Sequence, residues 1–338
     1  MSLEDAMAAA RRSAVLIDMS SRGLLGVTGG DRVRWLDGMI SGDVAALEAG
    51  PEGAGCYAAL LTNRGAIVAD LHVGRLGERF LLESLRQEIP RIAETLGRFI
   101  IADDVELADL SGDFVRLGLE GPDATAILVA SLEGGAAPPA PEAGLEGRIA
   151  GVEVLVAGFG WTGEVAYQLC CAPSDRAAVE AALEGVSSGG LVRADAEALE
   201  VLRVEAGLPW LGRELDEEVL PPEARLEHAI SNTKGCYVGQ EIVARLRARG
   251  QVNHLLVGLA IEEGDLPEVG APLSAGGRET GELTSVVRSP SLGAIALGYV
   301  RREHAEPGEE ITLEGGRARV CALPFVAKGD RSDAPGMA

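Results

Sequence analysis

The pattern of apolar residues changes at Gln251, and this change divides the chain. From there to residue 326, short apolar runs such as VNHLLVGLAI, GELTSVVRS and GAIALGYV are separated by glycine and proline. Alternation with a period of two is typical of strands with one buried face, and several short strands in succession favour a small closed barrel. The sequence therefore predicts a C-terminal β-barrel over residues 251–326 and a mobile tail over residues 327–338.

Two similar stretches precede this change, LGVTGGD at residues 25–31 and LGLEGPD at residues 117–123. Each reads as a strand, a glycine turn and the start of a helix. Either a structural unit is repeated, or two unrelated units both need glycine at their turns. Both explanations predict mixed helix and sheet before Gln251.

The other expected elements follow from hydrophobic periodicity and turn residues. We expect strands at residues 57–62, 66–73, 152–156 and 164–171, helices at residues 87–99, 193–206 and from Ser174 onward, and an exposed loop at residues 134–147. Together with the barrel, these elements predict the α+β class.

The composition indicates a globular protein without a membrane segment. Of 338 residues, 47% are hydrophobic, which is enough to form cores. No uncharged apolar run reaches the length of roughly 18 residues that a membrane helix needs. The N-terminus lacks the layout of a cleavable signal peptide, so we expect a cytoplasmic protein. The formal net charge of -22 argues against nucleic acid as a partner.

The five cysteines are odd in number and widely spread, which fits a reduced chain better than a disulfide framework. None forms a CxxC pair, so no local set of metal ligands is expected. The histidines, among them His72 and His228, occur in no recognisable motif and are expected to be structural. The glycine-rich turns match no phosphate-binding motif for nucleotides.

The stretch KGCYVGQE at residues 234–241 places Cys236 close to Lys234. If residues 242–249 are extended, three arginines share one side: Arg245, Arg247 and Arg249. One interpretation is an anion-binding strand beside an accessible thiol that the cations activate. The other is a solvated strand face and a buried, inert cysteine.

Two further residues are candidates for ligand contacts. Glu164 ends the glycine-rich stretch GFGWTGE, and its carboxylate can accept two parallel hydrogen bonds from an amino-pyrimidine-like ring. A β-turn with a surface glutamate is the simpler explanation. Arg203 in LRVEAG stands late in a helix, where it can bind a carboxylate or favour the helix C-terminus.

Taken in order, these stretches resemble the glycine-cleavage T-protein superfamily of folate-binding proteins related to aminomethyltransferase. The resemblance covers nearly the whole chain and includes VLIDMSSRGLLGVTGGDRVRWLDGMISGDV, LLTNRGAIVADLHV, LGLEGPDA, GFGWTGEVAYQL, LRVEAGLPWLGREL and KGCYVGQE. Within the superfamily, KGCYVGQEIVAR is similar to the signature of the YgfZ-type branch, folate-binding proteins associated with iron–sulfur cluster maintenance. Aminomethyltransferases have a different sequence there, without the cysteine.

The resemblance implies a ring-like arrangement of three domains around a channel for tetrahydrofolate, with the first two domains interleaved. The implied divisions are a first α+β folate-binding domain at 1–48 and 117–230, a second α+β domain at 49–116, the signature segment at 231–250, the barrel at 251–326 and the tail at 327–338.

The resemblance also implies roles for single residues. Glu164 matches the acid that holds the pterin ring, Arg203 a basic position near the folate, and Tyr57 an aromatic residue of the site. The anionic glutamate tail of folate suits Lys234 and the arginines, including Arg245. The hairpin departs from the transferase pattern, because Ala69 occupies the position of the aspartate assigned to catalysis and only Asp70 matches the second acid.

These features lead to one main functional hypothesis and two alternatives. We expect a tetrahydrofolate-binding accessory protein that supports iron–sulfur cluster assembly or repair, with Cys236 as the functional thiol and iron–sulfur proteins or assembly factors as transient partners. The first alternative is a folate-dependent aminomethyl or one-carbon transferase in which Asp70 replaces the absent acid. The second is a scaffold that has lost folate binding.

Overall fold

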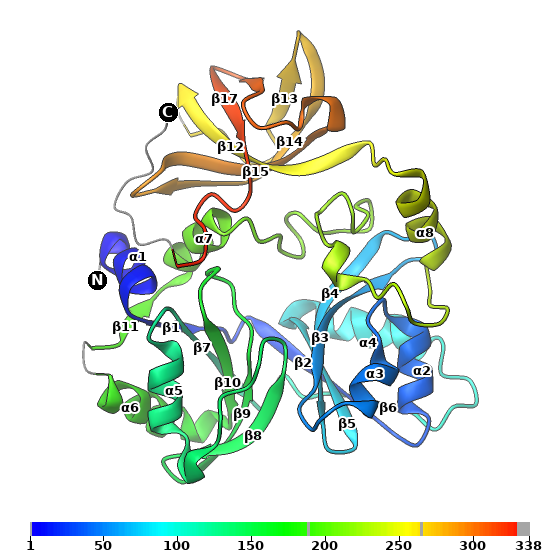
Figure 1. The fold of residues 1–338 in the computed structure, drawn as a ribbon, viewed down its shortest axis with the longest axis vertical. Helices are drawn as coiled ribbons and strands as arrows, with labels where there is room; N and C mark the ends of the chain where they lie inside the picture. Colours follow the sequence, from blue (N-terminus) through cyan, green and yellow to red (C-terminus); the bar gives the residue numbers. More distant parts are fainter. Residues whose placement is uncertain (1, 188–189, 264–265, 330–338) are drawn as a thin grey trace.

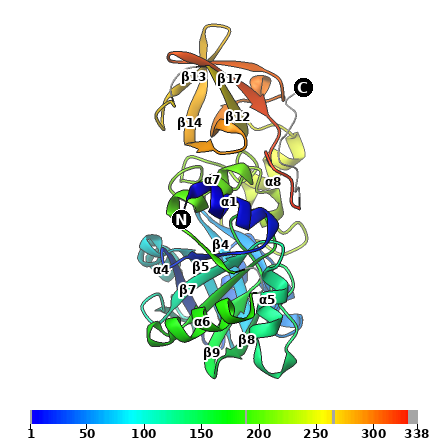
Figure 2. The ribbon, with the colours of Figure 1, turned by 90° about the vertical axis from the view of Figure 1, so that its left-hand side faces the viewer.

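A computed structural model describes residues 2–187, 190–263 and 266–329 of the chain. The described residues form two open sheets and one closed barrel, which lie as three lobes around a common centre (Figure 1). Figure 2 shows the barrel above the two sheet lobes, with α1 (Leu3–Arg12) and α7 (Ala196–Glu205) between them. The predicted α+β class and the predicted C-terminal barrel are confirmed.

The first lobe contains a six-stranded sheet in the order β11-β1-β7-β10-β9-β8. Its strands are β1 (Val15–Asp18), β7 (Val115–Glu120), β8 (Gly144–Ile149), β9 (Val152–Ala157), β10 (Ala166–Cys171) and β11 (Val192–Ala194). Helices α5 (Ala124–Ser131) and α6 (Arg176–Val186) cover one face, where Leu117, Leu119 and Leu169 are buried among their side chains. Short 3-10 turns η2 (Glu133–Gly135) and η3 (Pro173–Asp175) precede β8 and α6.

The second lobe contains a five-stranded sheet in the order β3-β4-β5-β2-β6. Its strands are β2 (Arg22–Thr28), β3 (Gly55–Leu61), β4 (Ile67–Leu76), β5 (Arg79–Leu85) and β6 (Glu106–Asp109). One face carries an apolar core with its helices, and these are α2 (Arg32–Met39), α3 (Val44–Ala49) and α4 (Ile89–Gly97), the last preceded by η1 (Arg86–Glu88).

The two sheet lobes are interleaved in the chain, but they divide at a different place from the predicted one. β1 ends at Asp18 in the first sheet, and β2 begins at Arg22 in the second sheet. Residues 22–48 therefore belong to the second lobe, whereas the sequence placed them in the first. The two similar stretches both form a strand, a turn and a helix, β2–α2 and β7–α5, with one unit in each sheet.

The helix-free faces of the two sheets face each other and carry polar residues. Because side chains alternate along a strand, the leucines of β7 point to the helices while Arg116 and Glu120 point to the opposite face. In β4, His72 likewise lies opposite Leu71 and Val73. A small cavity between the sheets is lined by His72 from one lobe and Arg116 from the other.

The barrel is closed, with strand order β12-β15-β14-β13-β16-β17 and β17 paired to β12. Its strands are β12 (His254–Glu263), β13 (Pro272–Ala275), β14 (Arg278–Ser289), β15 (Gly293–Arg301), β16 (Glu310–Leu313) and β17 (Gly316–Cys321), with η5 (Arg302–His304) after β15. Apolar side chains on its outer surface, such as Leu256 and Ile295, pack with α1 and α7. Of the predicted tail, residues 330–338 lie outside the described part of the chain.

Several local predictions differ from the structure. Residues predicted as extended after the KGCYVGQE motif form a helix, α8 (Gln240–Arg249), because alanine, leucine, arginine, glutamine and glutamate are good helix formers. Left-handed Gly239 and Gly250 flank it. The helix predicted from residue 193 begins only after Asp195, whose side chain accepts the Ala198 N–H and caps α7. None of the described helices has the length and apolar character needed to span a membrane.

Candidate functional site

A cavity of about 340 Å³ lies where the two sheet lobes meet the segment that leads to the barrel. Tyr57 and His72 line it from the second lobe, Phe159 and Trp161 from the loop between β9 and β10, and His228 from η4 (Glu227–Ala229). The cavity is therefore built from stretches that are far apart in the sequence, and much of its wall is aromatic.

The rings are stacked on one another. The His72 and Phe159 rings are nearly parallel, at 6° and 3.7 Å between centroids. Tyr57 lies 4.7 Å from His72 on one side and stacks on His228 at 5.5 Å on the other. Such rigid, flat walls are suited to a planar ring of a ligand.

A buried carboxylate shapes the glycine-rich loop at residues 158–164. One oxygen of Glu120 accepts the backbone N–H groups of Trp161 and Thr162, both at 2.9 Å, and the other accepts Gln168 Nε2 at 3.2 Å. Burial raises the pKa of Glu120. Gly160 is required here, because a Cβ at that position would lie 2.5 Å from the Glu120 carboxyl carbon. The sequence analysis missed Glu120, although an acid that ends the apolar run VRLGLE is an available signal.

Glu164 lines the cavity, as the resemblance implied, but one of its oxygens is held by the N-terminal helix. Arg11 Nη1 donates to Glu164 Oε1 at 2.9 Å and to the carbonyl of Thr162 at 3.1 Å. Arg11 Nη2 donates to Glu205 Oε2 at 2.8 Å. Arg11 therefore connects α1 to the cavity wall and to α7, and it fixes the direction of the Glu164 carboxylate.

Tyr57 and Asp70 form a hydrogen-bonded pair beside the aromatic wall. The Tyr57 hydroxyl donates to Asp70 Oδ2 at 3.1 Å, and Asp70 is 1% exposed. Burial, together with the neighbouring Asp70 carboxylate, raises the pKa of Tyr57 well above its ordinary value. Tyr57 is consequently a neutral hydrogen-bond donor at physiological pH.

Three buried polar atoms near this pair have no hydrogen-bond partner among the described residues: Asp70 Oδ1, Arg22 Nη1 and Trp161 Nε1. Arg22 is otherwise bound to Glu83, and its Cζ lies 4.5 Å from the Trp161 ring centroid. Buried polar groups in folded proteins nearly always have partners. One acceptor and two donors without partners, beside a flat aromatic wall, fit a polar heterocyclic ligand.

Ala69 and Asp70 point to opposite faces of their sheet. Ala69 is fully buried in the apolar core under the helices, whereas Asp70 reaches Tyr57 on the inner face. An acid at position 69 would therefore point into apolar side chains and away from the cavity. The acid on the inner face of this strand is Asp70, and Ala69, the position that the resemblance assigned to the catalytic aspartate, lies on the core side.

The sequence matches two family models, the GCVT N-terminal domain over residues 2–234 and the glycine cleavage T-protein C-terminal barrel domain over residues 255–327. The chain belongs to the glycine cleavage T-protein family. Curated relatives in this family include aminomethyltransferases of Rubrobacter xylanophilus, 33% identical over 97% of this chain and 87% of the relative, and of Saccharopolyspora erythraea, 32% identical over 94% and 88%.

Solved structures of the T-protein family agree with the architecture. The glycine cleavage system aminomethyltransferase T from Bartonella henselae superimposes with a TM-score of 0.85 at 26% identity, covering 96% of this chain and 89% of that one. Two sheet lobes and a barrel are thus the T-protein arrangement, and the cavity described above lies between the two sheet lobes and the segment that leads to the barrel.

The segment KGCYVGQEIVAR, residues 234–245, which resembles the YgfZ-type signature, does not line this cavity. Lys234 is 1% exposed at its side chain, and its Nζ donates to the carbonyls of Ile40 at 2.9 Å, Gly42 at 2.8 Å and Asp37. Burial lowers the pKa of this ammonium group. Lys234 binds the backbone that follows α2, so the prediction that it holds a folate tail is not what the structure shows.

Cys236 and Arg245 are exposed, and neither lines the 340 Å³ cavity. The side chains of residues 247 and 249, predicted to share a face with Arg245, lie outside the described part of the structure. The sequence analysis predicted that Cys236 and Lys234 lie at the folate site. In the structure, neither residue lines the cavity. The reason is that Lys234 turns inward to α2, while α8 replaces the predicted strand.

Arg203 is also not in the cavity wall. It is fully buried, and its guanidinium binds Glu214 Oε2 at 2.9 Å, Glu200 Oε1 at 2.6 Å, and the Leu208 carbonyl at 2.8 Å. It also donates to Ser285 Oγ in β14. Arg203 therefore anchors α7 to the barrel, and it does not line the cavity near which the resemblance placed it.

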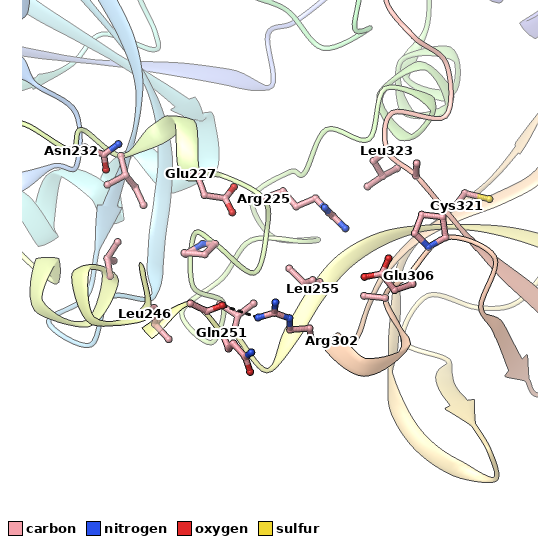
Figure 3. A pocket seen from close by; sticks show the side chains of 18 residues that line it. Arg225, Glu227, Asn232, Leu246, Gln251, Leu255, Arg302, Glu306, Cys321 and Leu323 are labelled. Atoms are coloured by element: carbon pink, nitrogen blue, oxygen red, sulfur yellow. Dashed lines mark hydrogen bonds between the residues drawn. The ribbon is translucent and has the colours of Figure 1, made fainter. Parts of the chain in front are cut away.

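The cations that line the cavity are Arg225 and Lys328, which the sequence analysis did not identify. Arg225 also lines a second cavity of about 600 Å³ between the segment around η4, α8 and the barrel (Figure 3). In Figure 3, Arg302 binds the Gly250 carbonyl at 2.8 Å on the opposite side of this second cavity. Arg225 has a left-handed backbone, φ 60°, and no local motif in the sequence marks it.

Proposed function

We propose that this chain is a cytoplasmic folate-dependent one-carbon transferase that binds tetrahydrofolate in the 340 Å³ cavity. The observation that carries the proposal is Asp70 Oδ1, a buried acceptor with no hydrogen-bond partner among the described residues. Asp70 does not itself line the cavity, but its other oxygen accepts the hydroxyl of Tyr57, which does. Relatives named aminomethyltransferase align over nearly the whole chain. Tetrahydrofolate would supply the nitrogen that accepts or releases the one-carbon unit.

In this proposal, different residues bind different parts of tetrahydrofolate. Tyr57, Phe159 and His228 offer planar surfaces for the pterin and aminobenzoyl rings. Asp70 and Glu164 are acceptors for ring N–H groups, and Glu164 is held in place by Arg11.

Arg225 and Lys328 are the cations at the cavity that suit the carboxylates of the glutamate tail. Binding the glutamate tail is the role that the resemblance implied for Lys234 and Arg245.

Asp70→Asn tests the binding step. Replacing a charged acceptor by an amide should weaken tetrahydrofolate binding by about ten- to a hundredfold, as expected for a hydrogen bond to a charged group. Asp113→Asn, in an exposed turn after β6, is the matched control. Anaerobic calorimetric titration gives both affinities. Unchanged affinity in Asp70→Asn would contradict this assignment, and no saturable binding by the wild type would refute the proposed cofactor.

Turnover is tested separately from binding. Formation of methylenetetrahydrofolate is followed with a panel of aminomethyl and N-methyl donors. Activity that is abolished in Asp70→Asn, and retained in Asp113→Asn, supports transfer in this cavity. Binding without turnover of any donor would instead indicate an accessory role.

That accessory role is the second candidate, and the motif KGCYVGQE favours it. Its Cys236 is exposed and reachable by a partner protein, so we propose as the alternative a folate-binding YgfZ-type protein that assists iron–sulfur enzymes or assembly factors. Cys236→Ala should then lower iron–sulfur enzyme activity in cells, while Cys321→Ala, which removes a half-buried thiol of the barrel, should not. Normal activity with Cys236→Ala would refute the thiol role.

A further inference from the structure

His72 lines the cavity but has no part in the binding scheme above. Its Nδ1 lies 2.8 Å from Glu142 Oε2, and its ring is stacked on Phe159. A carboxylate is an acceptor only, so Nδ1 carries the hydrogen and the lone pair of a neutral ring is on Nε2. Nε2 has no hydrogen-bond partner in the part of the chain that the structure describes.

Glu142 is held in place by both sheet lobes. Its backbone is left-handed, φ 63°, which costs energy for a residue with a side chain. Its N–H donates to the Gly158 carbonyl at 2.9 Å, and its own carbonyl lies against Gly55, where a Cβ would be only 2.0 Å away. Gly144 N–H donates to the Gly53 carbonyl at 2.7 Å. Contacts from two lobes thus maintain a strained residue that orients an imidazole at the cavity.

Other charged or polar groups also lie close to His72. Glu83 in β5 is opposite His72 in register, but Arg22 binds its carboxylate. Tyr57 contacts His72 through its ring and donates its hydroxyl to Asp70. Arg116 in β7 lines the small cavity between the sheets with His72. Glu142 is the carboxylate that is bonded to the imidazole.

We propose that His72 exchanges a proton with a nitrogen of the bound ligand through Nε2, and that Glu142 is its positioning residue. The inference rests on the proposed function, and it adds an acid–base group to that site. In the forward direction, the Nε2 lone pair takes a proton from a protonated amine nitrogen of the ligand, and the electron pair of that N–H bond becomes the lone pair of the neutral amine. The resulting imidazolium is held by the Glu142 carboxylate, and the reverse step returns the proton to an amine.

The first test needs no ligand. Nitrogen-15 NMR of the histidine side chains at pH 8 identifies the tautomer of His72, which is assigned by the signals lost in His72→Asn. The expected result is hydrogen on Nδ1 and none on Nε2. A His72 ring with hydrogen on Nε2 would overturn the proposal, because that atom could not accept a proton.

The second test measures tetrahydrofolate binding by anaerobic calorimetry between pH 8 and pH 5.5. Protonation of Nε2 removes the acceptor, so the Kd of the wild type should be higher at pH 5.5 than at pH 8. His72→Asn should lose this dependence. Glu142→Gln should also change this dependence, because the imidazolium loses the carboxylate that holds it.

The barrel contains a matched control, since His304 Nδ1 lies 3.0 Å from Glu309 Oε1, remote from this cavity. His304→Asn should bind tetrahydrofolate with the pH profile of the wild type. If His72→Asn binds tetrahydrofolate saturably with the pH profile of the wild type, the role of His72 is refuted but the proposed function is not. No saturable binding by the wild type at any pH would overturn the proposed function.

Discussion

Arg203→Met distinguishes a structural arginine from a ligand-binding one. The Arg203 and Glu214 side chains are both completely buried, and their charged atoms are 2.9 Å apart. Removing one partner of a buried ion pair leaves the other charge uncompensated, which costs about 3–5 kcal/mol. Glu214 would retain only Ser285 Oγ and the Trp210 N–H as hydrogen-bond donors among its described partners.

The predicted loss is large compared with the total stability of a typical domain, about 5–15 kcal/mol. Loss of the contact with Glu200 adds little to this cost in stability, because the Glu200 side chain is 22% exposed and its carboxylate can return to water. Urea unfolding should show a lower midpoint for Arg203→Met. The double variant Arg203→Met, Glu214→Leu should recover part of the loss, because no buried charge remains unpaired.

Ligand binding supplies the decisive comparison for Arg203. At a urea concentration and temperature where the variant is folded, its affinity for tetrahydrofolate should be within about twofold of the wild type, since Arg203 does not line the cavity. A variant with wild-type stability and strongly weakened tetrahydrofolate binding would refute this reasoning. That result would restore the role that the resemblance implied.

Three other predictions concern single sites. Glu120→Ala leaves the buried N–H groups of Trp161 and Thr162 without an acceptor, so unfolding should become easier by about 2–5 kcal/mol and limited proteolysis should reach the loop at 158–164. Lys234→Met removes three carbonyl contacts, one to Asp37 at the end of α2 and two to Ile40 and Gly42 after it, and should cost about 3 kcal/mol in urea unfolding without changing folate affinity; lost affinity would contradict its placement. In mass-spectrometric alkylation at pH 8, exposed Cys236 should react well before Cys56, because burial raises the pKa of Cys56 to about 12 and leaves almost no thiolate; faster reaction of Cys56 would contradict its burial.

Local patterns in the sequence predicted most of the secondary structure. The alternation after Gln251 predicted the strands of the barrel, and the two LG-containing stretches predicted a strand and a helix each. The sequence could not assign these two units to different sheets, because their local patterns are alike. Which sheet a strand joins depends on pairing with distant strands, such as β2 with β5 and β7 with β10.

The site residues that the resemblance singled out lie in different parts of the structure. Glu164 and Tyr57 line the cavity, as the resemblance implied. Arg203 has a partner nearby in the sequence, Glu200, but also distant ones, Glu214 and Ser285 of β14. The partners of Lys234 lie at the end of α2 and after it, so a short window of sequence shows at most part of the contacts that these two cations make. Long-range ion pairing of this kind is the physical reason why a cation in a motif was taken for a ligand contact.

The register of β4 gives a more general reason to consider faces before residue identities. Asp70 and His72 point to the inner face, where Tyr57 and Glu142 bind them, while Ala69 points into the core. In an aligned pair of adjacent acids, only one can face a cavity on one side of a sheet. The loss of an acid in such a pair therefore affects chemistry only if it occurs on the inner face, and in this chain the inner-face acid is present.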